Sequence, residues 1–316
     1  YLDYSMRRQD AYQDRSYMHD NNAYARVSYK LNDNARLTFH GSYSDGDSNY
    51  PNGLTRAQYE EDPTQNPGSE HKYKTEYKLA ALVYNQKIGA HELMAKLAYQ
   101  TKQYSLFWYG FSDASEWSYH PEMNLTLNHE FAGMRNKLVL GGEYRDHRMH
   151  DKSYEAESYS DIGAIESDNE LEDKSWGAYI QNELMVTKAL TVTAGLRYDN
   201  YDLQQTGKIS ESDTWSQKND AISPKLGMTY QFSPEFNLFA GFNSGFKSPS
   251  RLPKFASSAK LDPERLNAYE VGFRGYLANW LDYNIAFFLN DVRDKFVQPS
   301  AEMDAQYENA GETRAK

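Results

Sequence analysis

The sequence has no cysteine among its 316 residues, so neither a disulfide framework nor thiolate chemistry is available to it. Long apolar runs are also missing: the mean hydropathy is −0.87, and no stretch approaches the roughly 20 apolar residues that a membrane helix needs. Positive charge is in the minority, and the net charge is −11, which disfavours binding to nucleic acid. Helical membrane spanning is therefore excluded, whereas a β-barrel is not, because its strands need apolar residues only at every second position.

Aromatic residues are the first surplus, with 27 Tyr, 14 Phe and 5 Trp. A tyrosine ring is apolar and its hydroxyl is polar, which suits a membrane interface or the rim of a barrel. A tyrosine-rich soluble β-sandwich or a lectin-like sheet would show the same surplus. The aromatic content therefore favours a β-protein at an interface and leaves the soluble alternative open.

Hydrophobic residues recur with period two, which predicts strands with two unlike faces. In Leu190–Asp199, the clearest case, apolar residues alternate with threonine, arginine and aspartate. About fourteen such segments of roughly 9–14 residues follow one another, and a tilted membrane strand needs about 9–11. The apolar positions include Ala25, Val27, Leu31, Leu37, Phe39, Leu93, Ala95, Leu97, Leu138, Leu140, Leu196, Phe242, Val271 and Phe287.

The predicted connections alternate between short and long. The short ones are Asn32–Asn34, Gln86–Ala90, Ala132–Arg135, Val186–Lys188, Ser233-Pro234 and Ala278-Asn279, and the long ones are Gln9–Asn21, Asp45–Lys72, Tyr104–His120, His150–Asp173, Leu203–Asp220 and Lys247–Leu266. An up-and-down barrel in an asymmetric membrane shows this alternation, with tight periplasmic turns and long external loops. A β-propeller would instead repeat every 40 or so residues, and no such repeat is present.

The two faces of the predicted strands differ as a membrane barrel requires. One face carries residues that tolerate lipid, and most of the charged residues fall on the other. A sealed protein core would have to pair that many buried charges, whereas a water-filled or plugged lumen would not. The tyrosines expected to form an aromatic girdle on the apolar face are Tyr29, Tyr43, Tyr99, Tyr144 and Tyr198.

Five blocks in the C-terminal half resemble the TonB-dependent receptors of bacterial outer membranes. They are WGAYIQNELMVTKALTVTAGLRYD (Trp176–Asp199), SPKLGMTYQFSPEFNLFAGFNSGFKSPS (Ser223–Ser250), LDPERLNAYEVGFRG (Leu261–Gly275), LNDVRDKFVQ (Leu289–Gln298) and YENAGETRAK (Tyr307–Lys316). The blocks stand in the family's order. The N-terminal half is similar only in general pattern, including the loop Tyr50–Pro63, which resembles a Pro- and Gly-containing external loop of the family.

The resemblance implies an all-β fold, a transmembrane antiparallel up-and-down β-barrel of about 22 strands whose lumen holds an N-terminal plug. Residues 1–316 would form one partial barrel domain with about 14 of those strands. The chain starts at Tyr1 without an initiator methionine or a signal peptide and stops at Lys316, in a predicted strand. We therefore expect a fragment of a longer receptor, without the plug, the TonB box or the final strands.

The implied function is energy-coupled import of a scarce nutrient across the outer membrane of a Gram-negative bacterium. A ferric siderophore is the commonest cargo that the resemblance implies, and haem, cobalamin, another cofactor or an oligosaccharide are alternatives. The implied partners are the TonB–ExbB–ExbD complex, outer-membrane lipid with lipopolysaccharide, and the ligand, without a resident cofactor. A passive porin-type channel is the second interpretation. A hydrolase is disfavoured because no compact Ser/His/Asp set can be assigned.

Candidate ligand contacts lie in the predicted external loops. The aromatic rings of Tyr104–His120 could stack on a planar chelator, or they could pack the loop or rest among lipid headgroups. Arginines in Arg145–His150 would attract an anionic ferric complex. The basic cluster of Lys247, Arg251 and Lys254 could do the same, or could pair with lumen or lipopolysaccharide groups. The candidates are Tyr104, Phe107, Trp108, Tyr109, Trp117, Arg145, His147, Arg148, Lys247 and Arg251.

No metal site is predicted. The spacing of His147 and His150 fits one face of a helix better than a strand, and no further ligand set accompanies them. The acidic stretch Tyr154–Asp173 has no EF-hand spacing, so we expect a solvated loop. The lumen-facing charges expected to pair with one another and with the plug are Glu143, Arg145, Arg197, Asp199, Glu270 and Arg274.

Overall fold

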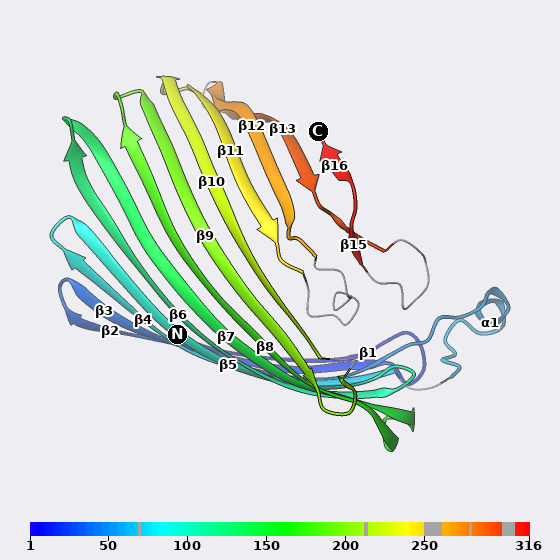
Figure 1. The fold of residues 1–316 in the computed structure, drawn as a ribbon. Coiled ribbons are helices and arrows are strands. Elements are labelled where there is room, and N and C mark those ends of the chain that lie inside the picture. The colour runs from blue at the N-terminus through cyan, green and yellow to red at the C-terminus, as the bar shows by residue number, and fades with distance from the viewer. Residues whose placement is uncertain (69–70, 212–213, 250–260, 278–279, 299–306) are drawn as a thin grey trace.

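The computed structural model describes residues 1–68, 71–211, 214–249, 261–277, 280–298 and 307–316. They form one curved antiparallel sheet in a single layer and one short helix (Figure 1). The strands of the sheet are β1 (Leu2–Asp10), β2 (Tyr17–Asn32), β3 (Ala35–Tyr50), β4 (His71–Ile88), β5 (His91–Phe107), β6 (Phe111–Phe131), β7 (Met134–Ser158), β8 (Asp161–Met185), β9 (Leu190–Gly207), β10 (Trp215–Ser233), β11 (Phe236–Lys247), β12 (Glu264–Leu277), β13 (Leu281–Arg293) and β16 (Glu312–Ala315).

The topology is a simple meander. Each strand of the 14-stranded sheet pairs with its neighbour in the sequence from β1 to β13, and β16 closes the order beside β13. Two further strands, β14 (Phe296–Val297) and β15 (Glu308–Asn309), pair only with each other. The predicted antiparallel up-and-down arrangement and the predicted number of strands are confirmed.

Tight turns lie along one edge of the sheet, and the longer connections lie along the opposite edge (Figure 1). Ala132 and Gly133, between β6 and β7, both have positive φ, 52° and 78°. This is the backbone of a two-residue turn whose twist matches that of the flanking strands. The predicted alternation of short and long connections is confirmed at β1–β2 and β3–β4, whereas the connections β5–β6 and β7–β8, predicted to be long, are about as short as the turns on the opposite edge.

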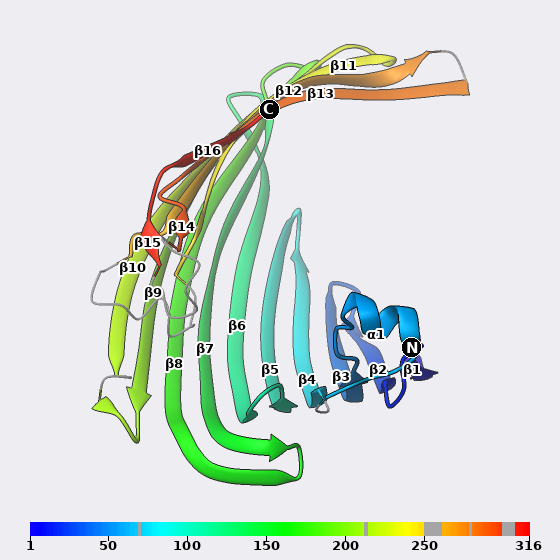
Figure 2. The ribbon, with the colours of Figure 1, turned by 90° about the vertical axis from the view of Figure 1, so that its right-hand side faces the viewer.

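The bounds predicted for two long loops are wrong. Most of Tyr104–His120 is strand, because β5 runs to Phe107 and β6 begins at Phe111, and only two residues separate β7 from β8 within His150–Asp173. β7 and β8 each have 25 residues, well beyond the predicted strand length, and their hairpin curves beneath the ends of neighbouring strands (Figure 2). Polar residues continue these strands because cross-strand pairs and water satisfy them outside an apolar phase.

The register places the predicted apolar residues on one face. Val27 lies opposite Phe39, Phe39 opposite Leu82, and Leu82 opposite Leu97. A second row runs through Leu125, Leu140, Ile180 and Leu196 on β6 to β9. We call this side of the sheet the apolar face and the opposite side the polar face.

The apolar face has no protein layer packed against it. Among the described residues, Val27 is 58 % exposed, Leu196 49 % and Phe287 65 %, and only ten hydrophobic residues are buried. The described core cluster is small, with Leu261 and Phe296 packed against Tyr307. An apolar surface across this many strands far exceeds the few hundred Å² that soluble monomers expose. The face therefore needs a second apolar phase, which a lipid bilayer supplies.

Aromatic rings border the apolar face on the side of the long hairpins. Tyr99 stacks near Trp117, and Trp176 lies 5.2 Å from Tyr198 between ring centroids. On β9 the span from the tight turn to Tyr198 is about 26 Å along the strand, close to the roughly 25 Å apolar band of such barrels. Beyond this border the same face carries ion pairs, which are Arg148–Glu172 (3.0 Å), Lys218–Asp202 (2.9 Å) and His150–Asp168 (2.6 Å).

The helix α1 (Arg56–Glu61) lies in the connection between β3 and β4. Thr55 caps its N-terminus, and Gln58 completes the capping box by bonding back to the Thr55 backbone. Within the described ranges, no helix is both long and apolar enough to cross a membrane.

Candidate functional site

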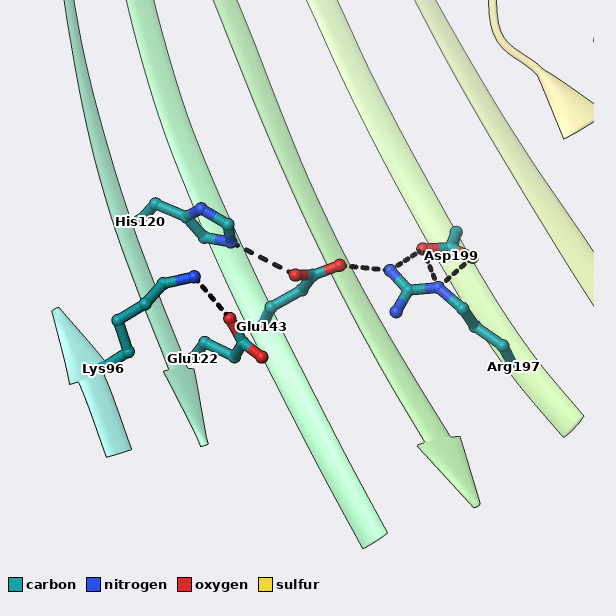
Figure 3. Close-up of polar contacts among 6 residues, drawn as sticks. All are labelled: Lys96, His120, Glu122, Glu143, Arg197 and Asp199. Carbon is teal, nitrogen blue, oxygen red and sulfur yellow. Dashed lines mark hydrogen bonds and ion pairs between the residues drawn. The ribbon is translucent and has the colours of Figure 1, made fainter. Parts of the chain in front are cut away.

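A chain of charged side chains crosses the polar face at the level of the aromatic border. Four strands contribute, and the register places Lys96 opposite Glu122, Glu122 opposite Glu143, and Gly177 between Glu143 and Asp199. Figure 3 shows the six side chains on one side of the ribbon. We call Lys96, His120, Glu122, Glu143, Arg197 and Asp199 the wall network.

The hydrogen bonds of the wall network form two groups, one of Lys96 with Glu122 and one of His120, Glu143, Arg197 and Asp199. Lys96 donates to Glu122 at 2.6 Å, and His120 Nε2 lies 3.2 Å from Glu143 (Figure 3). Arg197 donates from Nε to both carboxylate oxygens of Asp199, at 2.9 and 2.8 Å, and from Nη2 to Glu143. The predicted pairing among Glu143, Arg197 and Asp199 is therefore confirmed.

Gly177 makes the contact between β7 and β9 possible. It lies on β8, between Glu143 and Asp199, and a Cβ atom there would stand 2.4 Å from Arg197 Nη2 and 2.6 Å from Asp199 Oδ1. Any larger residue would occupy the space through which the guanidinium reaches Glu143. Because Gly177 has no side chain, Arg197 of β9 can reach across β8 to Glu143 of β7, although β7 and β9 do not pair.

A pocket of about 180 Å³ adjoins the network. Its lining includes His120, Arg145, Ser175 and Tyr201 in addition to the Arg197 ion pairs. Arg145 is half-buried and makes no ion pair or hydrogen bond to any residue that the structure describes. A half-buried guanidinium without a protein partner is suited to bind a carboxylate or phosphate.

The ladder between β6 and β7 is interrupted beside the network. Tyr119 pairs with Asp146 and Glu122 with Glu143, and the register is the same on both sides, but His120 and Pro121 make no ladder pair. Proline has no N–H to donate. His120 and Pro121 stay paired with Ala98 and Leu97 of β5, so the strand is held here from one side.

The other lumen-facing charges behave differently. The guanidinium of Arg274 lies 5.9 Å from the centre of the Phe239 ring. Glu270 is exposed, and neither residue makes an ion pair with a described residue. Their predicted pairing with charged groups of the sheet is not found.

The aromatic candidates separate into buried and exposed rings at the tip of the β5–β6 hairpin. Phe107 is 1 % exposed, whereas Trp108 is 50 % and Tyr109 81 % exposed. The His71 ring stacks on Trp108 at 4.1 Å and 13° and meets the edge of Tyr109 at 5.4 Å. Phe107 therefore packs the hairpin, while Trp108 and Tyr109 present free ring surface.

Tyr104 and Trp117 project from opposite faces. Tyr104 is on the polar face, and its ring lies 6.2 Å from that of Tyr73. Trp117 belongs to the apolar face, at the aromatic border, and carries Arg148 over its ring at 5.3 Å. The structure therefore does not bring Trp117 and Arg148 together with Tyr104 and Arg145.

The two histidines of the external β7 segment also face opposite sides, because they are three positions apart on a strand. His147 is 1 % exposed and lies 3.0 Å from Glu116, whereas His150 lies 2.6 Å from Asp168. They cannot share a metal ion. The acidic stretch beyond them is paired strand, and hydrogen bonding from Lys174 lowers the pKa of the Glu172 carboxyl.

Of the basic cluster, only Lys247 is described. Its ammonium lies 3.6 Å from Glu264 and 5.4 Å from the centre of the Phe296 ring. Arg251 and Lys254 lie outside the described residues. The prediction of an anion-attracting cluster therefore stays a prediction.

Sequence reasoning missed Lys96, His120, Glu122 and Gly177 as parts of a site. The sequence predicts a loop that ends at His120, although the alternation in Glu116–His120 puts Trp117 and Tyr119 on one face and His120 on the other. Among the described residues, one set of three groups has the spacing to hold a metal ion, and it consists of His120, Glu122 and Glu143.

The family model for the TonB dependent receptor-like β-barrel matches residues 2–316. The chain belongs to this family. TonB-dependent receptors are transporters rather than enzymes and reside in the outer membrane of Gram-negative bacteria. The polar face with its wall network is therefore the face that lines the lumen in such a receptor, and the apolar face is the one that meets lipid.

Sequence similarity to two curated proteins is consistent with this family. An uncharacterized TonB-dependent receptor of Haemophilus influenzae is 29 % identical over 118 residues, which is 36 % of this chain and 34 % of that protein. The metal-pseudopaline receptor CntO of Pseudomonas aeruginosa is 31 % identical over 101 residues, 30 % of this chain and 14 % of that protein.

A solved structure shares the fold. The unliganded ferric citrate transporter FecA superposes with a TM-score of 0.87 at 19 % identity, covering 99 % of this chain and 49 % of that one. The chain thus spans about half the length of this transporter.

Proposed function

We propose that the receptor containing this chain binds a ferric siderophore or a similar metal chelate outside the cell and imports it through a plugged barrel. Energy would come from the TonB–ExbB–ExbD complex, and this sheet would be part of the barrel wall. The observation that carries the proposal is a sheet of the TonB-dependent receptor family with one continuous apolar face and one charged face. Such a wall separates lipid from an aqueous or protein-filled lumen.

The choice of cargo rests on the exposed groups. Trp108 and Tyr109 offer ring surface at a hairpin tip, where a planar chelator would first make contact. Arg145 offers an unpartnered guanidinium on the lumen-facing side. The exposed rings of Trp108 and Tyr109, together with the guanidinium of Arg145, suit an anionic, partly aromatic chelate better than a neutral sugar. The names of CntO and FecA, which refer to metal chelates, are consistent with this class of cargo.

Lipopolysaccharide is the proposed neighbour of the apolar face above the aromatic border. Arg148 lies over Trp117 there, and an amphipathic ring next to a cation suits the boundary between acyl chains and phosphorylated headgroups.

The test is uptake of radioactive iron by a strain that lacks the gene, with and without the gene restored from a plasmid. A panel of catecholate, hydroxamate and carboxylate chelates would be offered under iron limitation, in hosts with and without TonB. The proposal predicts that at least one chelate enters only when both the receptor and TonB are present. Uptake independent of TonB would indicate a passive channel, and no effect with any chelate would exclude this cargo class.

A further inference from the structure

Three side chains of the wall network converge as metal ligands would. His120, Glu122 and Glu143 each offer one ligand atom, and these atoms lie within 4.8 Å of one another. His120 and Glu122 are two residues apart on β6 and so share a face, and Glu143 lies directly opposite Glu122 on β7. We propose that these residues bind one divalent transition-metal cation on the lumen-facing wall.

The donor set defines the class of cation. One imidazole and two carboxylates suit Zn²⁺ and neighbouring divalent ions such as Mn²⁺ and Fe²⁺. Metal–ligand bonds of about 2.1 Å separate tetrahedral ligands by about 3.4 Å, and His120 Nε2 and Glu143 Oε2 are already 3.2 Å apart. The site closes with a small side-chain adjustment, and further coordination positions stay open toward the lumen.

Of the described contacts of these three residues, only the one between His120 and Glu143 has to break when the cation binds. Lys96 donates a hydrogen bond to one oxygen of Glu122, and Arg197 donates one to Oε1 of Glu143. The second oxygen of Glu122 has no described hydrogen-bond partner, and Glu143 Oε2 faces only His120. The cation would replace the contact between His120 and Glu143, while Lys96 and Arg197 keep their carboxylates in place.

The electrostatics of the strand pair favour a cation at this point. Like charges directly opposite each other on neighbouring strands destabilise the pair, and Glu122 and Glu143 form such a pair. Lys96 and Arg197 offset them from either side, and a cation between the carboxylates would do so from the centre. The ladder between β6 and β7 is interrupted at His120 and Pro121, and the backbone that carries the imidazole is paired there with β5 alone.

This site belongs to the wall and does not depend on the identity of the cargo. Its test is equilibrium binding by the purified receptor, whereas the proposed function is tested by uptake into cells. Failure of one therefore does not imply failure of the other.

The experiment uses the complete receptor in detergent, freed of metal with a chelator and titrated with ZnCl₂ against a metallochromic indicator. We expect one saturable site, weakened at least tenfold by His120→Asn and by Glu122→Gln. The matched control is His129→Asn, because His129 lies on the same strand, is exposed and stands far from both carboxylates. That variant is expected to bind as the unmodified receptor does.

A second measurement keeps the test decisive if a variant misfolds, which its mobility on unheated gels would reveal. Co²⁺ bound to the unmodified receptor should show the visible absorption of a nitrogen- and oxygen-ligated ion rather than that of the hydrated ion. Absence of a saturable Zn²⁺ site with a hydrated-ion spectrum for Co²⁺ would overturn the proposal. Unchanged Zn²⁺ affinity in both folded variants would overturn it as well.

Discussion

Glu143 and Arg197 lie on β7 and β9, which do not pair, and they meet across Gly177 of the strand between them. The contact links β7 to β9 through side chains that meet across β8, in addition to the backbone ladder. It depends on the absence of a Cβ at one position. A single methyl group should therefore test whether the network stabilises the wall.

Gly177→Ala is expected to separate Arg197 from Glu143 or to distort β8, because the added Cβ would lie 2.4 Å from the guanidinium. Either response should cost about 1–2 kcal/mol of unfolding free energy. The measurement is the temperature at which the folded receptor loses its fast mobility on gels.

Gly245→Ala is the control for this variant, because a Cβ at Gly245 on β11 would meet nothing within 4 Å. Equal midpoints for the two variants would contradict the role assigned to Gly177.

Arg197→Met is expected to destabilise the receptor more than Gly177→Ala does. It would leave Asp199, which is 2 % exposed, without the cation that bonds both of its oxygens, and an unpaired buried charge is costly. We expect a loss of about 2–3 kcal/mol, smaller than for a fully buried pair because the guanidinium is partly exposed. Arg274→Met, on the same face but without a described ion pair, should have little effect; a loss as large as that of Arg197→Met would refute the argument.

Trp108→Ala combined with Tyr109→Ala should weaken cargo binding about tenfold, because two exposed rings would no longer stack on the chelate. Folding should be unaffected, since Phe107 packs the hairpin. Binding of the chelate identified by uptake would be measured on whole cells. Tyr12→Ala, at another exposed aromatic residue on the long-hairpin side, is the control, and equal affinities in all three proteins would remove these rings from the cargo site.

Ala194→Lys should destabilise the folded receptor by about 2–4 kcal/mol, because Ala194 is exposed on the apolar face midway between the tight turn and Tyr198, and the change places an ammonium in the centre of the lipid-facing band. Thr193→Lys, on the polar face of the same strand, should cost much less because its ammonium reaches the lumen. The comparison is the urea concentration at which each variant unfolds from lipid vesicles. A larger effect at Thr193 would reverse the assignment of the faces.

Much of the fold could be predicted from the sequence, because period two assigns each residue to a face without knowledge of its partner. Leu190–Asp199 shows this, since every apolar residue expected on one face of β9 lies there. The turn at Ala132 and Gly133 could also be predicted, because it lies between two segments in which apolar and polar residues alternate. The predicted loop bounds are wrong where a strand continues with polar residues, as β7 does. Apolar and polar residues no longer alternate there, so the sequence pattern does not show where the strand ends.

The wall network could not be derived in the same way. Glu143 and Arg197 are 54 residues apart, and their contact depends on the register of two strand pairs and on a glycine in the third strand. Pairing among lumen charges was predicted, and among the described residues it holds for Glu143, Arg197 and Asp199 but not for Arg145, Glu270 and Arg274. Local sequence does not contain the cross-strand register that separates the two groups.

The most direct test of the whole account is a series of single cysteines along β9, made possible because this chain has none of its own. Any cysteine elsewhere in the receptor would first be replaced, and cysteines would be placed in turn at positions 191 to 196, labelled with a fluorophore and reconstituted in vesicles. The account predicts alternation: a lipid-dissolved quencher reaches positions 192, 194 and 196, and it does not reach positions 191, 193 and 195. Quenching of the opposite set, or of neither set, would contradict a wall with its apolar face in lipid and its charged face toward the lumen.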